Sequence, residues 1–106
     1  MSDTKELLEL AARAMPFALM PCSCKIQPCR SDNGKHWRPD INSGDCAEMC
    51  ATLGINTNWW KLHVICVTPS GEMLAIENFA DHNNDRAAAW RMAALRVAAE
   101  IGEAMQ

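Results

Sequence analysis

The sequence predicts an α+β domain in which helices pack on a mainly antiparallel sheet. Three observations lead to this prediction: amphipathic helical segments at both ends and in the middle of the chain, hairpin-like segments between them, and a length of 106 residues. A chain of this length forms one domain with one modest core. We therefore expect residues 1–106 to form a single domain with the element order α-β-β-α-β-β-α, since a sheet covered by helices buries these apolar stripes economically.

The first third of the chain predicts a helix and a short hairpin. Asp3 is a candidate N-cap, and apolar residues then recur at helical spacing as far as Pro16. The following segment, residues 17–38, is interrupted by prolines and contains an Asn33-Gly34 turn signal. It predicts a short, irregular hairpin.

A second helix is predicted within residues 42–55. Ser43 can cap its start, and Gly54 can supply the left-handed residue at its end. Four apolar residues lie at the i, i+3, i+4 and i+7 positions: Cys46, Met49, Cys50 and Leu53. This is the buried stripe of an amphipathic helix, so we expect Cys46 and Cys50 to belong to the core.

A second hairpin is predicted after this helix, within residues 59–79. Alternate residues of its first strand are apolar and should share one face: Trp60, Leu62, Val64 and Cys66. The segment 69–72, Pro-Ser-Gly-Glu, turns the chain into the second strand. Cys66 is therefore expected in the core. Trp59 should face the other way, where cover by a helix is the expected outcome and exposure is the alternative.

The C-terminal segment predicts a long helix. Cap candidates occur from Asp81 to Asp85, and an apolar stripe follows through Trp90, Ala94, Val97, Ile101 and Met105. Alanine richness favours a helix and lets it lie close to a sheet. We interpret Asp81, His82 and Asp85 as caps and turn formers rather than as a metal or nuclease cluster.

Charge and composition restrict the classes of partner. The chain is 49% hydrophobic, 22% charged and carries a net charge of −3, which is typical of a folded globular protein. Residues 25–38 alone have a local charge of +3 from Lys25, Arg30, Lys35 and Arg38 against Asp32. General nucleic-acid binding is not expected of an acidic protein. No basic leader or bilayer-length apolar segment is present, so we expect a cytosolic protein without membrane association and with reduced thiols.

Four residues near the first hairpin could bind a metal: Cys22, Cys24, Cys29 and His36. Cysteine and histidine suit tetrahedral zinc, but the spacing C-x-C-x4-C-x6-H is not the usual C-x2-C arrangement, and Pro28 interrupts strand pairing. Three interpretations stay open: a hairpin without metal, which leads, a zinc site, and a disulfide such as Cys22–Cys29. A catalytic thiol would need a nearby base, and no nucleophile signature surrounds Cys24 or Cys29.

Aromatic and cationic residues suggest a protein-binding surface. If Trp37 and Trp59 are exposed beside Arg30, Lys35 and Arg38, they form a patch of the kind found at interface hot spots. We predict these five residues as partner-binding residues. The combination favours a protein partner over RNA, since no RNA-recognition aromatic motif is present. Phosphate-binding glycine loops and paired catalytic carboxylates are also absent from the sequence, so catalytic residues are not predicted.

Three segments together carry a family resemblance. They are "KELLELAARA", "HWRPDINSGDCAEMCATLGI" and "NNDRAAAWRMAALRVAAEIGEAM". Their W-x-P, polar loop, G-D-C, L-G-I and A-A-E-I-G elements resemble the bacteriophage ABA sandwich domain family, which tends to have alanine where this chain has Cys46. The resemblance implies an αβα layered sandwich of phage or prophage origin, expressed in the host bacterial cytoplasm, with no catalytic residues. It does not cover residues 16–35.

The sequence-based hypothesis is therefore a small, non-enzymatic phage accessory protein that binds a host or phage protein. Inhibition of a bacterial defence system, such as an anti-CRISPR role, is its most specific version. A zinc-binding module using Cys22, Cys24, Cys29 and His36 is the alternative, and a thiol-dependent enzyme is the third. No cofactor other than zinc is considered, and association into a homodimer stays open.

Overall fold

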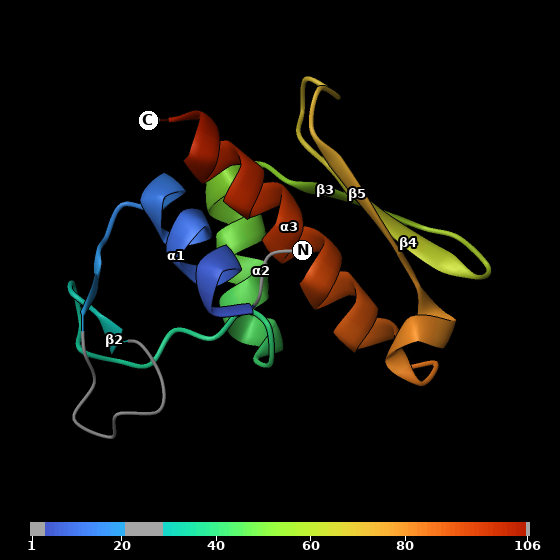
Figure 1. Cartoon of the computed structure of the whole chain (residues 1–106), viewed down its shortest axis with the longest axis horizontal. Coiled ribbons are helices and arrows are strands. Elements are labelled where there is room, and N and C mark those ends of the chain that lie inside the picture. Colours follow the sequence, from blue (N-terminus) through green and yellow to red (C-terminus); the bar gives the residue numbers. More distant parts are fainter. Residues whose placement is uncertain (1–3, 21–28, 106) are drawn as a thin grey trace.

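The computed structural model describes residues 4–20 and 29–105 and confirms the α+β class (Figure 1). In these residues the helices are α1 (Thr4–Ala14), α2 (Ser43–Leu53) and α3 (Arg86–Ala104), with a 3-10 turn η1 (Phe79–His82) before α3. The strands are β1 (Leu19–Met20), β2 (Cys29–Arg30), β3 (Asn56–Trp59), β4 (His63–Val67) and β5 (Leu74–Asn78). The predicted element order is confirmed, with one strand more than expected after α2.

The helix ends follow from capping residues. The Asn42 side chain accepts the backbone N–H of Asp45 at 2.9 Å, so the cap of α2 is Asn42 rather than Ser43. Gly54 ends α2 with φ of 71°, as its position predicts. Asp85 caps α3 by accepting the N–H of Ala88 at 3.1 Å, which confirms its interpretation as a cap.

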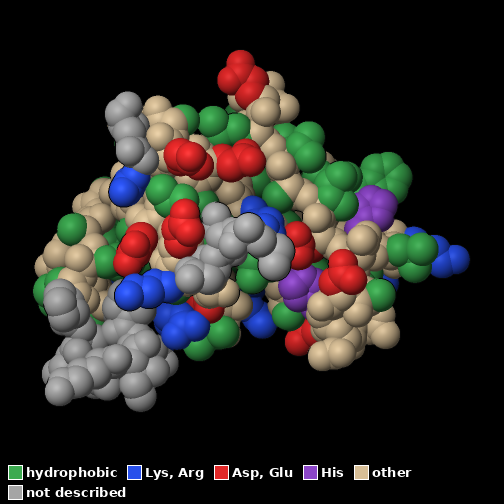
Figure 2. Space-filling model, in the orientation of Figure 1, with side chains coloured by type: hydrophobic (Ala, Val, Ile, Leu, Met, Phe, Trp, Pro, Cys, Tyr) green, Lys and Arg blue, Asp and Glu red, His purple; other side chains and the backbone are tan. Residues whose placement is uncertain are grey.

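The larger sheet has the strand order β3-β4-β5, and both pairings are antiparallel. Its first strand was predicted to run unbroken from Trp59, but the chain turns between β3 and β4, where Trp60 N–H donates to His63 O at 2.9 Å. Val64 and Cys66 are buried as predicted. The prediction that Trp60 and Leu62 share their buried row is wrong, because both lie in the turn and are 56% and 71% exposed. Figure 2 shows hydrophobic side chains on the surface at this end of the molecule.

Helix α3 is the central element of the fold. It packs against the sheet on one side and against α1 and α2 on the other (Figure 1). The fully buried residues of α3 are Ala89, Ala93, Ala94, Leu95, Val97 and Ala98. Small side chains let neighbouring elements approach α3 closely, as the alanine-rich sequence predicts. Met105, the last residue of the predicted stripe, is instead 63% exposed.

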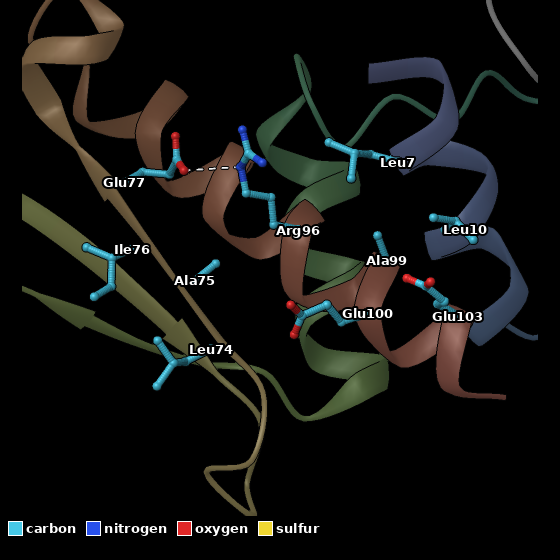
Figure 3. Close-up of a pocket in the computed structure, with 10 residues that line it drawn as sticks. All are labelled: Leu7, Leu10, Leu74, Ala75, Ile76, Glu77, Arg96, Ala99, Glu100 and Glu103. Carbon is cyan, nitrogen blue, oxygen red and sulfur yellow. Dashed lines mark ion pairs between the residues drawn. The ribbon is translucent and has the colours of Figure 1, made fainter. Parts of the chain in front are cut away.

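The two faces of the larger sheet differ. Ala75 points toward α3, whereas Leu74 and Ile76 point away from it and are 50% and 52% exposed (Figure 3). Cross-strand pairing places Ile65 beside Ile76 and Val67 beside Leu74, so all four residues share this outer face. The helices described all lie on the opposite side. The α-β-α layering implied by the family resemblance is therefore met on one face of the sheet only.

The first hairpin is confirmed as a short one. β1 and β2 pair antiparallel, and the chain turns after β2 where Gly34 has φ of 70° and its N–H donates to Arg30 O at 2.9 Å. This is the predicted Asn33-Gly34 turn. Among the described residues, no helix is long and apolar enough to cross a membrane.

Candidate protein-binding surface

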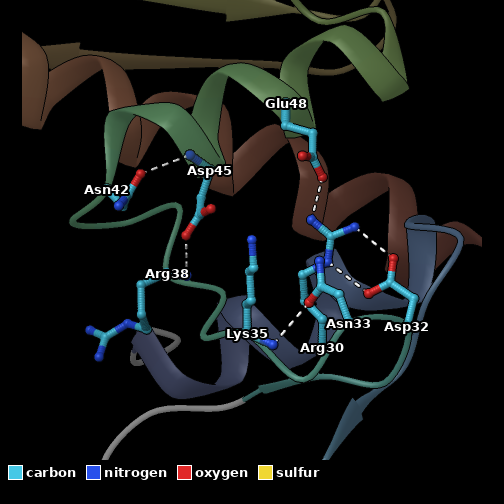
Figure 4. Close-up of polar contacts among 8 residues, drawn as sticks. All are labelled: Arg30, Asp32, Asn33, Lys35, Arg38, Asn42, Asp45 and Glu48. Carbon is cyan, nitrogen blue, oxygen red and sulfur yellow. Dashed lines mark hydrogen bonds and ion pairs between the residues drawn. The ribbon is translucent and has the colours of Figure 1, made fainter.

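Arg30 is held in place by interactions within the chain (Figure 4). Its guanidinium forms two hydrogen bonds to Asp32, at 2.9 and 2.7 Å, and an ion pair with Glu48 of α2. It also lies 4.3 Å from the centre of the Phe17 ring. The hydrogen bonds to Asp32 raise the pKa of Arg30 and lower the pKa of Asp32. Because its side chain is only 13% exposed, Arg30 joins β2 to α2 and offers little surface to a partner.

The guanidinium of Arg38 also forms an ion pair within the chain. Its guanidinium binds both oxygens of Asp40 at 2.8 and 2.6 Å, which raises the pKa of Arg38. Its backbone N–H donates to Asp45 at 2.9 Å. Lys35 has an exposed side chain without an ion pair in the described part of the chain. Of the three cations predicted to bind a partner and described here, only Lys35 is thus available.

The prediction that Trp37 lies on the surface is wrong. Its side chain is 0% exposed and meets the ring of Phe17 edge-on, with ring centroids 5.3 Å apart. Pro39 beside it is also fully buried. The W-x-P element therefore anchors this segment in the core instead of presenting an aromatic residue to a partner.

The polar loop after Pro39 is fastened to α3. Arg91 Nε donates to the backbone oxygen of Asp40 at 3.0 Å, and Arg91 Nη1 donates to Ser43 Oγ at 2.9 Å. The Asp45 carboxylate fixes the other end of the loop by accepting a hydrogen bond from the Arg38 backbone N–H. The described contacts of this motif thus assign it a role in folding.

Exposed aromatic residues gather instead at the turn between β3 and β4. Trp59 is 51% exposed and stacks on Phe79, with ring centroids 6.3 Å apart. Trp60 stacks on His63 at 5.9 Å, and Leu62 is the most exposed large apolar residue of the described chain. Cover by a helix was the expected outcome for Trp59, and the structure shows the alternative, an exposed side chain. Trp60 and Leu62 were missed as surface residues because their alternation with Val64 and Cys66 resembled a continuing strand.

The five predicted partner-binding residues do not form one patch. β2 and the turn between β3 and β4 lie at opposite ends of the molecule, with the helices between them (Figure 1). Trp59 is therefore separated from Arg30, Lys35 and Arg38.

Trp59 pairs with the buried Val64 and so lies on the inner face of the sheet, whereas Trp60 stacks on His63, which shares the outer face with Ile65. The apolar residues of this outer face are Ile65, Val67, Leu74 and Ile76. We call these four residues the sheet face.

Three cysteines pack in or against the core, as predicted. Cys46 and Cys66 are 0% exposed, and Cys50 is partly buried against the core. A hydrogen bond to Cys50, together with burial, raises the pKa of the Cys46 thiol. Burial raises the pKa of Cys66 to about 11, with Thr57 Oγ1 3.7 Å from its sulfur. Both thiols stay protonated at neutral pH, so neither is an effective nucleophile.

The predicted zinc ligands are only partly described. Cys29 is buried, and an antiparallel bridge pairs it with His36, as expected from the turn between them. Cys22 and Cys24 lie outside the described residues, as does Lys25. Within residues 4–20 and 29–105 no three potential ligands come together. The four-ligand site and the Cys22–Cys29 disulfide both stay predictions.

The histidine of the segment 81–85 has a local partner. His82 Nε2 lies 2.8 Å from Glu77 Oε1, and the other oxygen of Glu77 lies 3.1 Å from Arg96 Nε. With Asp85 acting as the α3 cap, these contacts support the structural interpretation of this segment.

Comparison with family models, curated proteins and solved structures finds no match for this chain. The resemblance to the bacteriophage ABA sandwich domain family therefore rests on the sequence motifs alone.

Proposed function

We propose that this chain is a non-enzymatic protein that acts by binding another protein. The observation that carries the proposal is the exposed apolar surface at one end of the molecule. Trp59, Trp60 and Leu62 at the β3–β4 turn are each more than half exposed, and the sheet face begins on β4 beside His63, on which Trp60 stacks. Contiguous exposed apolar residues on a small domain are typical of interaction sites, and tryptophan is enriched among interface hot spots.

The partner in this proposal is a protein of a bacterial host or of the phage itself, met in the host cytoplasm. This part is supported by the family resemblance, which implies a phage or prophage protein. Masking the surface of a defence component, as an anti-CRISPR protein does, is the specific version. Binding through one apolar end would suffice for such masking because no catalytic group is required.

The proposal is tested by comparing two single substitutions at opposite ends of the molecule. The partner is first captured from bacterial lysate with the immobilised chain and identified, and its affinity is then measured by calorimetry. Trp60→Ala is expected to weaken binding by about 2 kcal/mol, which is typical of a hot-spot tryptophan. Lys35→Ala is the control and should leave the affinity unchanged. If Lys35→Ala loses binding and Trp60→Ala retains it, the partner binds at the β2 end of the molecule and the proposal is wrong.

A zinc-binding module is the second candidate function, favoured by the cross-strand pairing of Cys29 with His36. If it is correct, protein purified under reducing conditions should contain about one zinc per chain, bound by the four predicted ligands. Metal analysis of Cys22→Ser with Cys24→Ser should then show that the zinc is lost. Equal metal content in wild type and this double variant would reject the site.

A further inference from the structure

Strand β5 has an unpaired edge. Its ladder with β4 is flanked by two 3.0 Å backbone bonds, Phe79 N–H to Leu62 O and Thr68 N–H to Met73 O. Hydrogen-bonded pairs alternate with non-bonded pairs in an antiparallel ladder. Ala75 and Glu77 therefore bond to β4, and the N–H and C=O groups of Leu74 and Ile76 point away from it. No described residue hydrogen-bonds to these outward groups.

A groove lies beside this edge (Figure 3). One wall is β5 itself, residues 74–77, and the other consists of residues from α1 and α3. Leu7, Leu10 and Ala99 contribute apolar surface to the helical wall, and Glu100 and Glu103 contribute carboxylates. In Figure 3 the Glu100 side chain is directed from α3 toward β5. The groove thus combines free backbone groups, apolar surface and charge.

The charge of the groove is negative. Its charged residues are three glutamates and Arg96, and Arg96 is already paired with Glu77 at 3.1 Å. Glu100 and Glu103 are exposed and have no ion pair among the described residues. Cationic side chains entering the groove could pair with these two carboxylates, while their aliphatic stems would pack on the partly exposed Leu10.

The negative charge of the groove also distinguishes two possible ligands of the β5 edge, a second copy of this chain and a cationic segment of another protein. A second copy of this chain, paired through its own β5, would bring another Glu77 toward Glu100 and Glu103. Like charges at such close quarters are unfavourable, and each copy already carries a net charge of −3. A cationic segment from another protein has the complementary charge.

We propose that β5 binds an extended, lysine- or arginine-bearing segment of the partner protein as a fourth strand of the sheet. Backbone bonds to Leu74 and Ile76 would hold the segment, alternate cationic side chains would lie in the groove, and the intervening apolar side chains would extend the sheet face. This inference rests on the proposed function and specifies how the partner is held.

The probe is a capped heptapeptide that alternates lysine and valine, compared with the same peptide carrying glutamate in place of lysine. Amide resonances and hydrogen exchange of the whole chain are followed by NMR during titration. The lysine peptide should shift and protect the Leu74 and Ile76 amides, and the glutamate peptide should not. Equal binding of both peptides, or shifts confined to residues 29–38, would overturn the proposal. So would protection of these amides by dimerisation without peptide.

Two variants, each with a matched control, test the charge and the backbone separately. Glu100→Gln with Glu103→Gln should weaken the lysine peptide about fivefold, since exposed ion pairs contribute modestly. Glu9→Gln with Asp81→Asn removes the same charge from exposed positions outside the groove and should change nothing. Ile76→Pro deletes an outward N–H without removing a bond to β4 and should abolish binding, whereas Ile76→Ala should retain it. Unchanged affinity in the double glutamine variant would contradict the charge assignment.

Failure of the strand-addition proposal can be distinguished from failure of the proposed binding function. If Trp60→Ala weakens the captured partner but Leu74 and Ile76 exchange freely in that complex, the strand-addition mode is wrong and the binding function stands. If no partner is bound through either end of the molecule, the proposed function itself is wrong.

Discussion

Gly102→Ala is expected to destabilise this protein by about 3 kcal/mol, a severe case of overpacking. In an ordinary helix the same change would stabilise, since alanine is the better helix former by about 1 kcal/mol. Here α3 crosses α1 so closely that a Cβ at position 102 would lie 1.7 Å from Leu10 O and 2.8 Å from its carbonyl carbon. Backbone atoms cannot rotate away as a side chain can. The helices must therefore separate, which opens the α1–α3 contact.

Urea unfolding followed by circular dichroism measures this effect, with Gly44→Ala as the matched control. Gly44 lies in the first turn of α2, and a Cβ there would meet only the Asn42 side chain at 3.2 Å. Its substitution should change the free energy of unfolding by less than about 1 kcal/mol. A Gly102→Ala protein as stable as wild type would show that α1 and α3 do not approach each other in this way.

Trp37→Ala is expected to cost about 4 kcal/mol, because it removes a large side chain from a fully buried position. Trp37 is 0% exposed and packs on Phe17, which in turn lies against Arg30. Domains of this size are stable by only about 5–15 kcal/mol, so such a loss removes a large fraction of the total. The segment joining β2 to α2 would lose its apolar anchor.

Trp60→Ala is the control for this substitution, since it deletes the same side chain from a position that is 56% exposed. It should change the free energy of unfolding by about 0.5 kcal/mol or less, as surface substitutions usually do. Chemical unfolding monitored by the fluorescence of the remaining tryptophans compares the two variants. If Trp37→Ala unfolds at the wild-type urea concentration, Trp37 is not part of the core.

The helices and most strands could be predicted because their signals are local. Periodic apolar residues and capping side chains place α2 and α3 within a few residues, and the same periodicity identifies Cys46 as a core residue. The turn between β3 and β4 was missed because its residues, Trp60 to Leu62, include no glycine, proline or asparagine. Apolar alternation continues through it, so the sequence resembles one long strand.

The candidate site was predicted less well than the fold because exposure depends on tertiary contacts. A tryptophan beside cations resembles an interface, yet Trp37 fills the core and Arg30 is neutralised partly by Glu48, eighteen residues away. The pairing of Arg38 with Asp40 is local and could have been anticipated from their spacing. The β5 groove was beyond prediction, since its lining combines residues of α1, β5 and α3, and α1 lies far from the other two in the sequence.

The central claim is that partner binding occurs at the sheet end of the molecule and not at the cationic turn after β2. Leu62 and Lys35 are both exposed and lie at opposite ends of the molecule. A photoreactive amino acid is placed at either position, the chain is expressed in bacteria and irradiated, and cross-linked products are identified by mass spectrometry. We predict a discrete adduct with one protein from position 62 and none from position 35. The same adduct from position 35 alone would contradict the claim.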